Sequence, residues 1–157
     1  MELLLETLPK PNGVIVADDD PLIRSVIKSR LEALGQTVFQ AANGAEAVAL
    51  AAKVDACLVI LDIRMPRMDG LAACSEIREL PGYEQTPIVM LTFDDGQKAQ
   101  TGASRAGATM FLVKPFGSAT LMLALSRYLP LDPATRSAIH ADAVRAAGGQ
   151  VFRRAGV

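Results

Sequence analysis

Five polar residues stand at the ends of short apolar runs that are far apart in the sequence. The runs end at Asp18 and Asp19, at Asp62, at Thr92 and at Lys114. A hard divalent cation such as Mg²⁺ binds carboxylate oxygens and commonly phosphate oxygens as well. A carboxylate held beside such a cation can attack phosphorus, while an ammonium and a hydroxyl stabilise the phosphoryl oxygens. If the fold brings them together, these residue types indicate phosphoryl transfer onto a carboxylate.

Apolar runs alternate with amphipathic segments along the chain. Runs such as 14–17 and 57–61 are continuously apolar, which is typical of strands buried on both faces. Asp20 and Pro21 favour a helix start, as an N-cap followed by proline at the first helical position. We expect strands at 14–17, 37–40, 57–61, 87–91 and 110–113, and helices at 21–34, 44–52, 71–80, 97–106 and 118–129. The apolar stripe of the first helix should contain Leu22, Ile23, Val26, Ile27, Leu31 and Leu34.

Five strand–helix units of this kind predict a parallel sheet with helices on both faces, because right-handed crossovers place the helices there. We therefore expect an α/β fold with a flavodoxin-like, doubly wound sheet of five strands in the order 2-1-3-4-5. In that order the first, third, fourth and fifth strands are neighbours. The five polar residues would then meet beyond the carboxyl ends of the strands, where ligands of such sheets bind.

Length and composition agree with one globular domain. The chain has 157 residues, 50% of them hydrophobic, and a formal net charge of −1, which gives no bulk basic field for nucleic acid. No apolar run approaches the roughly 20 residues of a membrane span, and the N-terminus lacks the cations of a signal peptide. We expect a cytoplasmic protein with a leader at 1–13, the domain at 14–129 and a tail at 130–157. The tail should hold one short extra helix, capped by Asp132 and Pro133 and stopped by Gly148 and Gly149.

Four stretches of the sequence resemble the receiver domains of response regulators in two-component signalling. They read VIVADDDPLIR, LVILDIRMPRMDG, PIVMLT and GATMFLVKPF, and the similarity covers about 13–129. The resemblance implies that Asp62 is the phosphoacceptor and a metal ligand, that Asp19 is a direct ligand of Mg²⁺, and that Asp18 is a second acidic residue at the metal. It also implies that the backbone carbonyl of Arg64 binds the metal. Mn²⁺ is an alternative to Mg²⁺ at this site.

The same resemblance assigns the switch residues. Thr92 and Lys114 match the pair that senses the phosphoryl group. Phe111 matches the aromatic side chain that swings inward when the threonine moves. Pro115 matches a proline whose preceding peptide bond is usually cis, which would aim Lys114 inward.

One departure from the family concerns residue 93, which is usually small and here is phenylalanine. Bulk at Phe93 is expected to crowd the path of water or a small donor to Asp62. Arg64 lies two residues after Asp62, and Asp94 two residues after Thr92. Their opposite charges are expected to pair weakly across the mouth of the pocket. We therefore expect Arg64, Phe93 and Asp94 to gate the acceptor.

The leading interpretation is a stand-alone phosphoacceptor that receives its phosphoryl group from a histidine kinase or phosphotransfer protein. It would not be an enzyme, because it reacts stoichiometrically and at most slowly phosphorylates and dephosphorylates itself. A downstream protein is expected to bind the face formed by the fourth helix, the fifth strand and the fifth helix. That face lies around Lys98, Arg105, Phe111 and Met122, and a homodimer is left open.

Two other functions compete with a phosphoacceptor as interpretations of these residues. The first is an interaction module that keeps the acidic pocket but is not regulated by phosphorylation, which a test of phosphate-analogue binding with Mg²⁺ would distinguish. The second is a metal-dependent phosphatase with an aspartyl nucleophile. Such enzymes need a second acid two residues after the nucleophile, and position 64 holds arginine, which disfavours this class.

Overall fold

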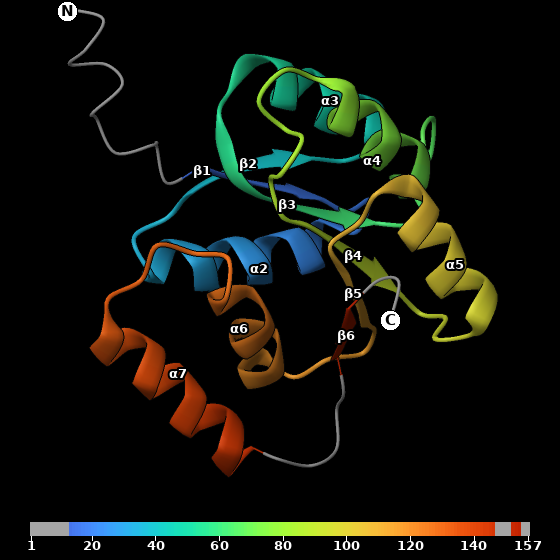
Figure 1. The fold of residues 1–157 in the computed structure, drawn as a ribbon. Coiled ribbons are helices and arrows are strands. Elements are labelled where there is room, and N and C mark those ends of the chain that lie inside the picture. The colour runs from blue at the N-terminus through green and yellow to red at the C-terminus, as the bar shows by residue number, and fades with distance from the viewer. Residues whose placement is uncertain (1–12, 147–151, 155–157) are drawn as a thin grey trace, which may run out of the picture.

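The chain folds around a six-stranded sheet with the strand order β2-β1-β3-β4-β5-β6 (Figure 1). The computed structural model describes residues 13–146 and 152–154. Residues 1–12 of the expected leader lie outside this description, as do Gly148 and Gly149, which were expected to stop the helix in the tail. The strands are β1 (Gly13–Ala17), β2 (Thr37–Ala41), β3 (Ala56–Asp62), β4 (Ile88–Thr92), β5 (Met110–Val113) and β6 (Phe152–Arg154). The first five strands are parallel and follow the predicted order, which confirms the doubly wound architecture.

Helices cover both faces of this sheet. They are α2 (Pro21–Ala33), α3 (Gly44–Lys53), α4 (Gly70–Glu79), α5 (Gln97–Ala106), α6 (Ser118–Ser126) and α7 (Pro133–Arg145). Figure 1 shows α3, α4 and α5 on one face and α2 and α6 on the other. Because successive strand side chains point to opposite faces, Ile15 and Phe111 join the first layer of the core, whereas Val16 and Leu112 join the second. In the part of the chain that the structure describes, no helix is long and apolar enough to cross a bilayer.

Helix α2 buries a narrower stripe than predicted. Ile27 and Leu31 are fully buried, but Leu22 and Val26 remain 71% and 47% exposed. At 3.6 residues per turn, these two residues lie about 100° or more from the centre of the buried stripe. The prediction was therefore wrong for Leu22 and Val26, which form an exposed apolar flank of the helix.

Helix α6 ends at Ser126, earlier than the predicted Leu129. Pro130 follows Leu129, and a proline disfavours the helical conformation in the residue before it. Leu129 is nevertheless buried, so the turn after the helix keeps this side chain in the core.

The tail contains the expected extra helix. Helix α7 is capped by Asp132 as predicted, and Figure 1 shows it beside α6. Its Ile139 is buried. The guanidinium of Arg136 donates to two backbone oxygens, one at the C-terminus of α6 and one shortly after it. These contacts attach α7 to the domain.

The tail also supplies a strand that was not predicted. Residues 152–154 pair antiparallel with β5, so that Arg153 lies opposite Phe111. Three residues are too few for an alternating pattern to be visible in the sequence. As a result, β5 is not an edge strand, because β6 occupies its outer side.

A chain shortened to end at Leu131 should keep the parallel sheet and unfold cooperatively. Within 132–146, Ile139 is the one buried apolar residue, and burial of one such side chain is worth about 1.5–3 kcal/mol. Thermal unfolding followed by far-UV circular dichroism should therefore show one transition at a moderately lower temperature. A lost or split transition would show instead that the tail is integral to the domain.

Candidate functional site

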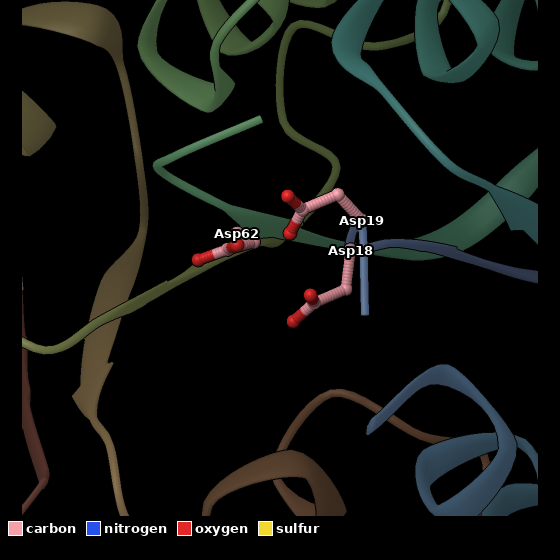
Figure 2. A group of neighbouring side chains, drawn as sticks. All are labelled: Asp18, Asp19 and Asp62. Atoms are coloured by element: carbon pink, nitrogen blue, oxygen red, sulfur yellow. The ribbon is translucent and has the colours of Figure 1, made fainter. Parts of the chain in front are cut away.

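Three aspartates meet beyond the carboxyl ends of β1 and β3 (Figure 2). Asp18 and Asp19 follow β1 directly, and Asp62 is the last residue of β3. One carboxylate oxygen from each lies within 4.8 Å of the other two. Asp18 is fully buried and Asp62 is only 6% exposed, whereas Asp19 is exposed. The fold thus brings together the three carboxylates that the sequence placed at one edge of the sheet.

Lys114 enters the same cluster from the end of β5. Its Nζ lies 2.8 Å from Oδ2 of Asp18 and 3.3 Å from Oδ1 of Asp62. The peptide bond between Lys114 and Pro115 is cis, as the sequence predicted. One buried ammonium thus faces two buried carboxylates, with the carboxylate of Asp19 nearby. The cluster keeps a net negative charge.

The two buried aspartates differ in how their oxygens are engaged. Oδ1 of Asp18 accepts the backbone N–H of Asp20 at 2.9 Å, and its Oδ2 contacts Lys114. Arg24 adds a bond of 2.7 Å from its guanidinium to the backbone oxygen of Asp18. Among the hydrogen bonds and ion pairs of residues 13–146, the side chain of Asp62 has Lys114 as its one partner. Asp18 is therefore fixed, while Asp62 retains a carboxylate oxygen for a ligand or a reaction.

The surroundings act on the ionisation of Asp62 in opposite directions. Burial is the largest cause that raises the pKa of this carboxyl, and repulsion by Asp18 raises it further. Lys114 lowers the pKa by charge attraction and by its hydrogen bond. A cation beside the three carboxylates would favour the ionised form of Asp62, which is the nucleophilic form.

Two of the predicted switch residues, Thr92 and Phe111, lie on the neighbouring strands β4 and β5. The Thr92 hydroxyl accepts the backbone N–H of Asp94 at 3.0 Å and donates to the backbone oxygen of Asp94 at 3.2 Å. It therefore turns toward the loop that follows β4 and makes no bond to Asp62 or Lys114 within the described residues. Phe111 is buried in the core layer beneath α3, α4 and α5.

The predicted pair between Arg64 and Asp94 does not form. In the described part of the chain no ion pair joins them. Instead, Oδ1 of Asp94 accepts the backbone N–H of Gly96 at 2.8 Å, a local turn bond available without any distant partner. Phe93 does lie at the pocket: its side chain is 71% exposed, and its ring centroid is 5.2 Å from Nζ of Lys114.

These residues surround a concave pocket of about 380 Å³. It is lined by Asp18, Asp19, Asp20, Ile23, Asp62, Ile63, Arg64, Thr92, Phe93 and Lys114. The four residues assigned to the metal are in this lining, as are Thr92 and Lys114. Phe111 and Asp94, assigned to the switch and to the gate, are not in it. The supporting role of Arg24 was missed, because a cation six residues after Asp18 gives no recognisable signal on its own.

The loop after Asp62 is closed by the backbone of Gly70. The N–H of Gly70 donates to the backbone oxygen of Ile63 at 2.8 Å. A Cβ at position 70 would lie only 2.1 Å from the backbone oxygen of Asp62. The absence of a side chain therefore lets helix α4 begin directly against the end of β3. This contact sets the path of the loop that carries Arg64.

Comparisons with known proteins agree with this geometry. The family model of the response regulator receiver domain matches residues 14–126. The transcriptional regulatory protein SrrA of Staphylococcus aureus is 32% identical over 118 residues, which are 75% of this chain and 48% of that protein.

Two solved structures show the same fold. The chemotaxis protein CheY4 of Vibrio cholerae superposes with a TM-score of 0.71 and 37% identity, covering 74% of this chain and 98% of that chain. The receiver domain of the sensor histidine kinase PA1611 from Pseudomonas aeruginosa PAO1 gives a TM-score of 0.69 and 31% identity, covering 75% and 97%. The latter structure has a magnesium ion coordinated in its active site cleft.

The parallel sheet, its acidic edge and the match over 14–126 lead to one conclusion: the chain belongs to the response regulator receiver-domain family of two-component systems. The chain spans about half the length of the curated relative that it matches, 48% of SrrA.

Replacing Gly70 with alanine should destabilise the protein more than the same change at Gly102. The new Cβ would overlap the backbone oxygen of Asp62, and overpacking of this kind costs about 1–3 kcal/mol. Chemical denaturation of Gly70→Ala should show this loss of unfolding free energy. Gly102→Ala is the matched control, because its Cβ meets nothing closer than 3.5 Å. Equal stabilities of the two variants would contradict the close approach.

Proposed function

We propose that this protein is a phosphoacceptor whose Asp62 receives a phosphoryl group from a histidine kinase or a phosphotransfer protein. The observation that carries this assignment is the unequal engagement of the two buried carboxylates. Asp18 has both oxygens bound, whereas Asp62, among the hydrogen bonds and ion pairs of the described residues, is paired with Lys114 alone and opens into the pocket. The reaction is stoichiometric rather than enzymatic, and we expect it to occur in the cytoplasm.

The cluster has the composition of a site for a hard divalent cation. Three carboxylates supply oxygens within 4.8 Å of one another, and Lys114 balances only part of their charge. Mg²⁺ fits this donor set, and Mn²⁺ is the alternative. We assign Asp18, Asp19 and Asp62 to the metal, together with the backbone carbonyl of Arg64. When bound, the metal neutralises charge on the carboxylates and the phosphoryl group.

The chain's own residues account for the transfer step as follows. An oxygen of Asp62 forms the new P–O bond while the P–N bond of a donor phosphohistidine breaks, and the electron pair stays on the donor nitrogen. Lys114 is already within 3.3 Å of Asp62, so its ammonium stands beside the site of the incoming phosphoryl oxygens. The Thr92 hydroxyl must leave Asp94 to reach those oxygens.

Signal output would follow from the movement of Thr92 and of Phe111, which lies on the neighbouring strand. Lys98 and Arg105 are exposed on α5 and are available to a downstream protein. Phe111 and Met122 are not part of that surface. Phe111 is buried, and Met122 lines a groove between α2, α6 and α7 together with Ile139. We therefore centre the partner face on α5 rather than on α6. A homodimer could use the same face.

The phosphorylation-independent interaction module remains the alternative function. It shares the fold and the acidic pocket but predicts no change on adding a phosphodonor. The phosphatase has no support in the geometry, because Arg64 occupies the position where the general acid would be.

Phosphorylation at Asp62 can be tested with acetyl phosphate and Mg²⁺. Intact-mass measurements should show the addition of one phosphoryl group, and Asp62→Asn should abolish it because the nucleophilic oxygen is lost. Excess chelator should also abolish it, since the carboxylates then repel the incoming anion. Asp55→Asn is the control, since Asp55 is exposed at the opposite end of β3. Unreduced labelling of Asp62→Asn would refute the assignment.

The steric gate can be tested separately with Phe93→Ala. Removal of the exposed ring should speed both phosphorylation by acetyl phosphate and spontaneous dephosphorylation, because the path to Asp62 widens. The decay of the phosphorylated protein can be followed by intact mass. Leu22→Ala is the matched control: Leu22 is also 71% exposed but does not line the acidic pocket. Unchanged or slower decay in Phe93→Ala would end the idea of a gate.

A further inference from the structure

Phe93 stands at the boundary between two hollows of the surface. Its ring lines the acidic pocket and also the adjoining apolar groove of about 260 Å³. The side chain is 71% exposed, so burial in the core does not explain its placement. The ring faces the ammonium of Lys114, whose Nζ lies 5.2 Å from the ring centroid.

This distance is within the range of a cation–π interaction. A lysine ammonium within about 6 Å of an aromatic centroid is attracted by the negative face of the ring. The Lys114 ammonium then has three partners on different elements: Asp18 after β1, Asp62 on β3 and Phe93 after β4. Two of these partners are buried carboxylates, and the third is an exposed aromatic ring.

We propose that Phe93 is a positioning residue that acts through Lys114, holding its ammonium at the wall of the pocket where the phosphoryl oxygens arrive. Phosphorylation would move the negative charge at Asp62 from its carboxylate to the phosphoryl oxygens in the pocket, while the buried Asp18 continues to attract the ammonium. The exposed ring of Phe93 attracts the same ammonium and so opposes the pull of Asp18. This inference rests on the proposed function, but it is independent of the gate, which requires only the bulk of Phe93.

Substitutions that separate the charge of the ring from its size provide the test. Phe93→Leu keeps much of the bulk and removes the π face. A ring-fluorinated phenylalanine at position 93 keeps the shape and weakens the negative face. Phe93→Tyr keeps both. An exposed cation–π contact is worth about 0.5–1 kcal/mol, which corresponds to about a two- to five-fold change in affinity.

The readout is the affinity for beryllofluoride in the presence of Mg²⁺, measured by fluorine NMR. We expect Phe93→Tyr to match the unsubstituted protein, and Phe93→Leu and the fluorinated residue to bind about two- to five-fold more weakly. The resonances of the Lys114 Cε protons should lose their ring-current shift in Phe93→Leu. Leu22→Ala, which removes an apolar side chain from the same groove, should leave the affinity unchanged.

The outcomes separate this inference from the proposed function. Equal affinity across the series at position 93 would overturn the positioning role and leave the phosphoacceptor intact. Equal weakening in Leu22→Ala would also overturn it, because the apolar groove rather than the ring charge would then be responsible. No binding to the unsubstituted protein would overturn both proposals.

Discussion

The buried ammonium of Lys114 between Asp18 and Asp62 ties the ends of three strands together. Charges taken out of water are tolerated only when they are paired, and loss of one partner of a buried pair commonly costs about 3–5 kcal/mol. The contact requires β1, β3, β4 and β5 to be consecutive neighbours, with their carboxyl ends at one edge. The strand order and the site are therefore consequences of the same constraint. Two local contacts support this arrangement: Gly70 fixes the backbone beside Asp62, and Arg24 fixes the backbone beside Asp18.

The pairing is incomplete, and this incompleteness is the basis of the proposed chemistry. One ammonium balances one of the two buried carboxylates, and Asp19 adds a further charge at the mouth of the pocket. Such a cluster is electrostatically unfavourable alone, since like charges raise one another's pKa. It becomes favourable when a cation enters. The protein thus carries a local electrostatic cost at this edge, while the core layers on either side of the sheet supply the stability.

Much of the architecture could be predicted because it depends on repeating patterns. The continuous apolar runs predicted the strands, and the doubly wound architecture suggested their order, so Asp18, Asp19, Asp62, Thr92 and Lys114 were expected at one edge. Features decided by a few local bonds could not be predicted. Asp94 turns to Gly96 instead of Arg64, because the N–H of a residue two positions away is a nearer partner than the exposed guanidinium of Arg64. β6 is three residues long and has no periodicity to detect.

Local hydrogen bonds of Thr92 also bear on the free-energy difference between the two arrangements of the proposed switch. In this structure the Thr92 hydroxyl makes two bonds to the backbone of Asp94. Each ordinary bond contributes about 0.5–1.5 kcal/mol net, and a bond to a charged group about 1.5–3 kcal/mol. Exchange of the two Asp94 bonds for one bond to a phosphoryl oxygen is therefore nearly balanced. It follows that Thr92 alone would only shift a population between the two arrangements. Under the proposed function, the larger bias would come from Lys114, because its carboxylate partner on β3, Asp62, is the group that we propose to be phosphorylated.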